Sequence, residues 1–323
     1  MAIKFSRNKG SEEGKPLRAA VIGTGYLGRF HAQKYAAIKG VELVAIVDID
    51  SKQANSVANE VGCRAVTDYR EILDEIDLAS IVVPTDLHFD IAKECLQSNC
   101  HLLVEKPITQ TIDEAEELIS IARENDLVLQ VGHLERFNPA IMALDGVLKN
   151  PTFIECQRMA PFKTRGTEVN VVLDLMIHDI DIILSLIGAD VSQINSVGGS
   201  VLSDEVDIAN ARLQFETGCV ANVTASRASR DTVRKIRIFQ PDAYISVDYQ
   251  DRKIAIYRLK GGGMPVPGLP NVTMEHKKFK QGDPLMTEIE SFVKTVREGG
   301  QPVVSGEDGK RALEVATQIN EKL

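Results

Sequence analysis

The stretch LRAAVIGTGYLGRFHAQKYAAIKGVELVAIVD, residues 17–48, contains the pattern that decides the fold. It predicts a buried strand over 17–23, a glycine turn GTGYLG over 23–28 and then a helix that Gly40 ends. A second strand over 41–48 ends in an acid. Together these elements are typical of a dinucleotide-binding βαβ unit, with a glycine turn that holds no ligand as the alternative.

Each glycine of the turn has a physical role in this interpretation. Gly23 permits the tight turn, Gly25 lets the backbone approach a pyrophosphate, and Gly28 lets the helix pack closely on the strand. The phosphates then lie at the helix N-terminus, beside Tyr26 and Leu27, where N–H groups and the helix dipole favour negative charge.

Asp48 follows the second strand and is expected to accept hydrogen bonds from the ribose hydroxyls of the cofactor. Its carboxylate would repel a 2′-phosphate, and no arginine follows it closely. The sequence therefore favours NAD over NADP, although Lys52 lies nearby.

Strands and helices continue to alternate up to residue 133, which predicts a doubly wound parallel sheet with right-handed crossovers. Ligands of such sheets bind at the carboxyl ends of the strands. The cofactor contacts expected at this edge are Pro84, Thr85, His88 and Glu105. Lys106 and His133 also lie at strand ends. Lys106 is either a functional lysine or an ordinary surface lysine, and His133 is expected to contact the substrate.

The segment LDLMIHDID, residues 173–181, places acids and a histidine in a nearly all-apolar helix. At 3.6 residues per turn, Asp174, His178, Asp181 and Ser185 form one stripe. Buried carboxylates need partners, so the stripe predicts a polar pocket or a metal site, with a thin solvent-facing strip as the alternative.

From residue 152 the pattern changes to short strands with period-2 alternation, which predicts an antiparallel sheet packed on helices by one face. We expect a second subunit to cover the other face, as a homodimer or homotetramer. The predicted organisation is a polar tail over 1–16, an NAD-binding domain over 17–134 and a substrate-binding and oligomerisation domain over 135–323. Residues 261–270 form a Gly/Pro loop.

Composition excludes several classes of protein. The net charge of −9 argues against nucleic-acid binding, and no span approaches the roughly 20 apolar residues that a membrane helix needs. Five cysteines without metal-ligand spacing fit a cytoplasmic protein with neither a disulfide framework nor a structural zinc.

Arginines are the expected ligands of an anionic substrate in this acidic chain, because guanidinium groups bind phosphates bidentately. Arg136, Arg158 and Arg165 are the candidates for substrate binding. The basic run over 227–237 reads better as a solvated or intersubunit strand.

Three motifs taken together, GTGYLG, EKP at 105–107 and D-x-x-x-H at 174–178, resemble the Gfo/Idh/MocA family of nicotinamide-dependent sugar oxidoreductases. The resemblance implies a Rossmann domain followed by an open, largely antiparallel sheet domain, and a catalytic trio of Lys106, Asp174 and His178. Leu175, Met176 and Ile177 depart from the small residues common in the family.

The segments GHLERFNPA (132–140) and 159–182 are most similar to the branch of this family that oxidises UDP-N-acetylglucosamine at its 3-hydroxyl. That resemblance implies a nucleotide-sugar substrate and a role in 3-amino sugar synthesis for lipid A or surface glycans. Oxidation of another sugar or of inositol is the alternative within the family.

The resemblance also implies a mechanism. His178, with an unperturbed pKa of about 6.5, would act as general base, Asp174 would orient its ring, and Lys106 would stabilise charge on the substrate oxygen. Two rival hypotheses remain: a metal site formed by Asp174, His178 and Asp181, and a non-catalytic NAD-sensing regulator.

Overall fold

The computed structural model describes residues 14–163, 169–259 and 271–323. These residues form two compact units, each with a sheet of its own. The first unit extends to His133 and includes Leu285–Lys310, and the second comprises Leu134–Pro284 and Arg311–Leu323. Most of the predicted tail, Arg165 and the loop over 261–270 lie outside the described residues.

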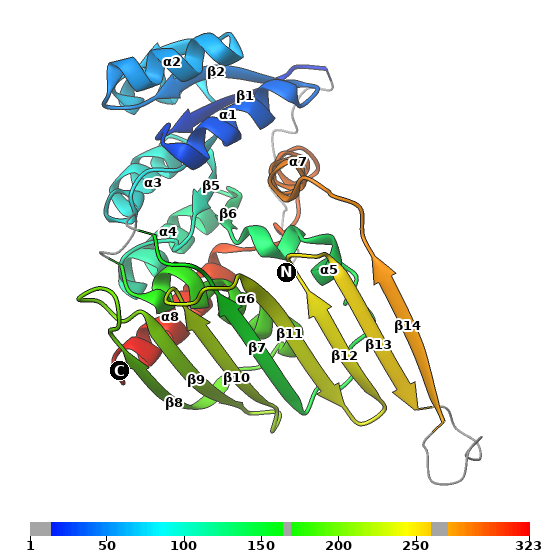
Figure 1. Ribbon diagram of the computed structural model, residues 1–323. Helices are drawn as coiled ribbons and strands as arrows, with labels where there is room; N and C mark the ends of the chain where they lie inside the picture. Colours follow the sequence, from blue (N-terminus) through cyan, green and yellow to red (C-terminus); the bar gives the residue numbers. More distant parts are fainter. Residues whose placement is uncertain (1–13, 164–168, 260–270) are drawn as a thin grey trace, which may run out of the picture. The chain divides into compact units, whose positions relative to one another are not determined.

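The first unit contains a six-stranded sheet in which every pair of neighbours is parallel. Figure 1 labels four of its strands, β1, β2, β5 and β6. The strand order is β3-β2-β1-β4-β5-β6, which confirms the predicted doubly wound Rossmann sheet. The strands are β1 (Leu17–Ile22), β2 (Val41–Val47), β3 (Arg64–Val66), β4 (Leu78–Ile81), β5 (His101–Glu105) and β6 (Leu129–Gly132).

Helices connect these strands, and local sequence signals fix their ends. They are α1 (Tyr26–Ala37), α2 (Ser51–Val61), η1 (Tyr69–Glu75), η2 (Thr85–Leu87), α3 (His88–Gln97) and α4 (Ile112–Glu124). Asp50 caps α2 by accepting from the backbone of Lys52, and Thr111 and Glu114 form a capping box on α4. Gly62 ends α2 with a left-handed φ of 77°.

The predicted boundary that assigned all of 135–323 to the second domain is corrected by the structure. Helix α7 (Pro284–Glu298) and the first residues of α8 (Gly306–Asn320) belong to the first unit. The Val131 amide donates to the Val304 carbonyl at 3.1 Å, which joins the returning chain to β6. The sequence gives no signal for this return, because α7 has an ordinary amphipathic pattern that would pack on either sheet.

The second unit contains an eight-stranded sheet in the order β14-β13-β12-β11-β7-β10-β9-β8. All neighbours are antiparallel except β7 and β10, as expected for a mostly antiparallel sheet. The strands are β7 (Phe153–Met159), β8 (Val191–Gly199), β9 (Ile208–Phe215), β10 (Val220–Ser226), β11 (Val233–Gln240), β12 (Ala243–Asp248), β13 (Lys253–Leu259) and β14 (Val272–Lys278).

The apolar helix predicted around 173–187 has an irregular start. A π-helical turn η4 (Val172–Met176) leads into α6 (Ile177–Ile187), and Gly188 ends the helix at a φ of 65°. The Asn170 side chain accepts from the amides of Val172 and Leu173, both at 3.1 Å. Asp174 therefore lies in a widened turn, where the 3.6-residue period used to align it with His178 does not hold.

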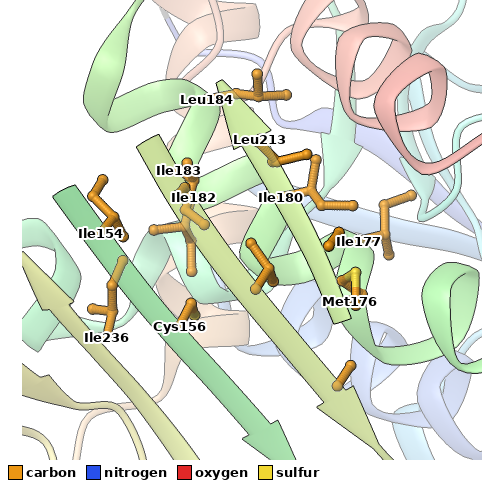
Figure 2. Packing of buried hydrophobic residues seen from close by; sticks show 14 of the residues in the cluster. Ile154, Cys156, Met176, Ile177, Ile180, Ile182, Ile183, Leu184, Leu213 and Ile236 are labelled. Carbon is orange, nitrogen blue, oxygen red and sulfur yellow. The ribbon is translucent and has the colours of Figure 1, made fainter. Parts of the chain in front are cut away.

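The core of the second unit lies between α6 and one face of the sheet. Figure 2 shows Met176, Ile177, Ile180 and Ile183 packed near strands that carry residues such as Cys156. Short helical segments η3 (Leu134–Phe137) and α5 (Pro139–Met142) complete the unit. Within the described ranges, no helix is long and apolar enough to cross a membrane.

Candidate active site

The turn between β1 and α1 depends on two glycines. Gly23 has a φ of 91°, a left-handed value that glycine adopts without strain. A methyl group at Gly28 would overlap the carbonyl oxygen of Gly23. The geometry agrees with the tight turn and close packing expected at these positions, and their contact with a cofactor remains a prediction.

The N-terminus of α1 has the properties of an anion site. Gly25 is the N-cap residue, and no side chain in the described part of the chain caps the helix there. Apart from Gly25 and its neighbours in the chain, no described residue has an atom within 4 Å of the place where a Gly25 side chain would begin. The open space at Gly25, at the start of α1, fits the predicted approach of a pyrophosphate to the first N–H groups of this helix.

The Asp48 carboxylate is held in one orientation at the end of β2. One oxygen accepts from the amide and hydroxyl of Thr24 at 2.8 and 2.7 Å, and the other accepts from the amide of Asp50 at 2.9 Å. The carboxylate is only partly buried. A pre-oriented, accessible acid at this edge fits the predicted contact with ribose hydroxyls.

The residues predicted at the end of β4 differ in accessibility. Pro84 is exposed and Thr85 is half-buried, so both can reach a ligand. His88 is buried, and its Nε2 and Nδ1 lie 3.0 and 2.9 Å from the carbonyl oxygens of Val83 and Pro107. Since both ring nitrogens face backbone, this geometry does not support the expectation that the His88 side chain binds the cofactor.

Glu105 and Lys106 lie where β5 ends. The Glu105 side chain is 13% exposed, and its two oxygens lie 3.2 Å from His31 Nε2 and 3.3 Å from the Lys106 amide. Lys106 is half-buried and precedes a cis peptide bond to Pro107. His133, the predicted substrate contact after β6, is buried.

The second unit brings several predicted residues together around α6. Asp174 and His178 are half-buried, whereas Asp181 is buried. Arg136, on η3, has a guanidinium nitrogen 3.7 Å from Asp181 Oδ1, and 14% of its side chain is exposed. The histidine and acids of the stripe therefore lie along the mainly buried segment formed by η4 and α6, and one of them, Asp181, lies beside a cation.

Arg158 is placed differently from the prediction. Its side chain is 3% exposed, and Nε and Nη2 donate to the two Asp179 oxygens at 2.7 and 3.0 Å. Nη1 donates to Glu135 at 3.2 Å. Burial alone would lower the pKa of Arg158, but the Asp179 carboxylate outweighs it and raises this pKa above its ordinary value. The expected diphosphate contact is not supported, because the guanidinium is buried against protein carboxylates.

Asp179 and Glu135 are the two carboxylates that bind Arg158, and the sequence did not assign either of them. Asp179 broke the apolar pattern of its helix, and an acid on an otherwise buried face signals a buried cation. The identity of that cation could not be read from the sequence, since Arg158 is 21 residues away on β7. The ring of Tyr249 lies 6.0 Å from the Arg158 guanidinium.

No group of three His, Cys, Asp or Glu side chains that could hold a metal ion occurs in residues 14–163, 169–259 and 271–323.

The glycine turn, the fixed acid after β2 and the parallel sheet are those of a dinucleotide-binding domain. Residues 17–133 match the family described as "Oxidoreductase family, NAD-binding Rossmann fold". Residues 148–245 match the GFO/IDH/MocA C-terminal domain. The chain therefore belongs to the GFO/IDH/MocA family of oxidoreductases, and NAD is its cofactor.

Similar proteins narrow the comparison within this family. UDP-N-acetylglucosamine 3-dehydrogenase from Acidithiobacillus ferrooxidans is 41% identical over 304 residues, 94% of this chain and 96% of that protein. A solved structure of that enzyme matches with a TM-score of 0.90 and covers 95% of this chain and 97% of its own. The scyllo-inositol 2-dehydrogenase of Bacillus subtilis is 28% identical and covers 93% of this chain and 92% of its own.

Proposed function

We propose that this protein oxidises the 3-hydroxyl of UDP-N-acetylglucosamine to a ketone, with NAD as hydride acceptor. The observation that carries the proposal is the 41% identity to the Acidithiobacillus ferrooxidans enzyme over 94% of the chain. Inositol 2-dehydrogenases are more distant, at 28%, 26% and 24% identity. The 3-keto sugar nucleotide would supply 3-amino sugar synthesis for lipid A or surface glycans.

The residues that would hold NAD all belong to the first unit. The first amides of α1 would bind the pyrophosphate, and the fixed carboxylate of Asp48 would bind the ribose hydroxyls. Pro84 and Thr85 would contact the cofactor at the end of β4, and Glu105 at the end of β5. NAD supplies the nicotinamide ring that accepts the hydride.

Lys106, Asp174 and His178 are the proposed catalytic residues. His178 would take the proton from the 3-hydroxyl as the hydride leaves the same sugar carbon, which balances the oxidation. Asp174 would stabilise the protonated ring of His178. The Lys106 ammonium would donate a hydrogen bond to the substrate oxygen and stabilise its developing negative charge.

Among the described residues, Arg136 is the proposed contact for the diphosphate of the substrate. His133 is proposed to contact another part of the substrate. Arg136 keeps an exposed portion beside Asp181, which suits a ligand contact. Arg165 remains a candidate by sequence alone. Arg158 is better explained as the residue that fixes α6 through Asp179.

A second copy of the chain is the proposed cover for the outer face of the eight-stranded sheet. Register pairs align Phe153, Phe239, Tyr244, Tyr257 and Met274 across five strands, on the face opposite the core. Phe239 is 38% exposed and Met274 is 62% exposed. An apolar row of this kind fits a homodimer or homotetramer interface.

A cytoplasmic location is also proposed. All five cysteines are free thiols, and four of them are buried. A reducing compartment suits such a chain.

The decisive experiment follows reduced nicotinamide while the protein is incubated with NAD and single substrates. We expect turnover with UDP-N-acetylglucosamine, little with free N-acetylglucosamine, and none with scyllo- or myo-inositol. The product should have lost two hydrogens by mass, and NMR should place its ketone at C3. Turnover with inositol alone would overturn the proposal.

Lys106→Ala and His178→Ala distinguish an enzyme from an NAD-sensing regulator. We expect both variants to lose turnover while they bind NAD in calorimetry. Absence of turnover in the unmodified protein with every sugar tested, together with intact NAD binding, would instead favour the regulator.

A further inference from the structure

A buried histidine of α1 contacts the residue that precedes Lys106. His31 is fully buried, with Nε2 3.2 Å from Glu105 Oε1 and Nδ1 3.0 Å from the Ser80 hydroxyl. Ser80 lies on β4, and its hydroxyl oxygen is 2.9 Å from the Tyr35 hydroxyl. The imidazole therefore connects the Glu105 carboxylate to the neighbouring strand through side chains that exclude water.

A second buried histidine contacts the residue that follows Lys106. His88 begins α3, and its Nδ1 lies 2.9 Å from the Pro107 carbonyl oxygen. Its Nε2 lies 3.0 Å from the Val83 carbonyl oxygen, just beyond β4. Burial lowers the pKa of His88 and so favours the neutral ring, and a neutral imidazole carries a hydrogen on only one nitrogen. This hydrogen can serve only one of the two carbonyls at a time.

The residues on either side of Lys106 are thus both connected to β4 or to the chain just after it. His31 connects Glu105 to Ser80, and His88 connects Pro107 to Val83. Glu105 Oε1 lies next to His31, and the other carboxylate oxygen, Oε2, accepts a hydrogen bond from the Lys106 amide at 3.3 Å. Behind it, Gly132 pairs with Glu105 across β5 and β6, and a methyl group on Gly132 would lie 2.8 Å from the Glu105 carboxylate. The carboxylate has little room to move, since β6 closes one side and His31 the other.

We propose that His31 and His88 are positioning residues that fix the Lys106 turn, His31 through Glu105 and His88 through Pro107. The inference rests on the proposed function only in giving Lys106 a catalytic role. Neither imidazole touches the reacting atoms. Their effect is to hold the backbone from which the Lys106 ammonium extends, and a shift of about 1 Å in such a group can cost on the order of a hundredfold in rate.

The first test is kinetic. His31→Ala and His88→Ala should each lower kcat by at least about tenfold and change the Kd for NAD by less than about threefold. His101→Ala is the matched control. His101 lies at the other end of β5, where its Nδ1 accepts from the Val128 amide at 2.9 Å. It should lower stability and leave kcat unchanged.

Conservative variants separate positioning from bulk packing. The amide nitrogen of asparagine reaches the place of histidine Nδ1, and that of glutamine reaches the place of Nε2. We expect His88→Asn to keep the bond to Pro107 and most of kcat, and His88→Gln to keep only the bond to Val83 and to stay slow. Equal recovery by both variants would overturn the role of the Pro107 contact.

Hydrogen exchange of residues 103–112 tests the inference without any substrate. His31→Ala and His88→Ala should increase the exchange rate of these amides and leave the exchange rates in β1 and β2 unchanged. His101→Ala should not increase the exchange rate of residues 103–112. Unchanged exchange and unchanged kcat in the two variants would overturn the proposal. Failure of the unmodified protein to oxidise UDP-N-acetylglucosamine would reject the proposed function alone, since the exchange result stands apart from it.

Discussion

Arg158 on β7 and Asp179 on α6 form a buried, two-bond ion pair, with donor–acceptor distances of 2.7 and 3.0 Å. Asp179 directly follows His178 in the sequence, so the pair fixes the helix that carries the proposed general base. A two-bond contact restrains the rotation of α6 as well as its distance from the sheet.

Arg158→Met should destabilise the protein by about 3–5 kcal/mol in urea unfolding, because it leaves the buried Asp179 charge without its partner. The double variant Arg158→Met/Asp179→Leu should recover much of that loss. Arg212→Met, on the exposed side of β9, is the control and should be near neutral. A raised KM for UDP-N-acetylglucosamine at unchanged stability would instead restore the diphosphate contact predicted from sequence.

Glu288 on α7 should make stability depend on pH. Its side chain is fully buried, and neither carboxyl oxygen has a hydrogen-bond partner among the described residues. Burial, and secondarily the nearby Glu105 charge, raises the pKa of Glu288 well above its ordinary value. Because the folded protein binds this proton more tightly than the unfolded chain does, the contribution of Glu288 to the free energy of unfolding is fully present below about pH 4. This contribution is lost as pH rises toward the folded-state pKa.

Glu288→Gln should therefore match the parent protein near pH 4 and exceed it increasingly in unfolding free energy above that pH. Glu290→Gln, an exposed position on the same helix, is the control. A constant difference between Glu288→Gln and the parent across pH 4–9 would contradict the expected protonated state.

The stability that Asp207 contributes should depend on pH in the opposite sense. Burial would raise the pKa of Asp207, but hydrogen bonds from Arg227 at 2.7 Å and from backbone amides, including that of Leu202, hold this pKa well below 3.8. A depressed pKa gives stability that is present above about pH 4 and lost as pH falls further toward the folded pKa.

The stability deficit of Asp207→Asn should consequently be largest at pH 6–7 and should narrow below about pH 4. Guanidinium unfolding at a series of pH values measures it, with the exposed Asp204→Asn as control. A deficit that persists unchanged at pH 3 would mean that the charge of Asp207 does not contribute.

Asp48→Ser should weaken NAD binding by about tenfold to a hundredfold, since a hydrogen bond to a charged group is worth about 1.5–3 kcal/mol. NADP binding should fall less or improve, because the repulsion of the 2′-phosphate is removed. Calorimetry with both cofactors measures the ratio, and Glu42→Gln on the exposed side of β2 is the control. Equal losses for the two cofactors would remove Asp48 from the ribose contact.

Phe239→Lys should dissociate the proposed homo-oligomer, because a charge placed between Phe153 and Tyr244 in the aromatic row would be buried without a partner. Sedimentation velocity should show smaller particles than for the parent protein, whereas Val303→Lys, at a position 48% exposed in the first unit, should leave the size unchanged. A parent protein that sediments as a monomer would contradict the interface.

The sequence by itself determined the fold class, the glycine turn and most strands of the two sheets, although it did not predict the short strand β3. These features are local: a strand, a glycine turn and a helix follow one another within 12 to 30 residues, and alternation of period 2 or 3.6 records which side is buried. Gly23, Asp48 and the strands β7 to β14 could all be located in this way.

Only the tertiary structure decided the partners of buried polar groups and the return of the chain to the first sheet. Arg158 had the chemistry of a phosphate ligand, yet it pairs with Asp179, and His88 lay in a cofactor loop, yet it faces two backbone carbonyls. The reason is physical. A side chain's type fixes which bonds it can form, but the cost of burying it unpaired makes the nearest partner in space decisive, and that partner is set by packing between distant segments.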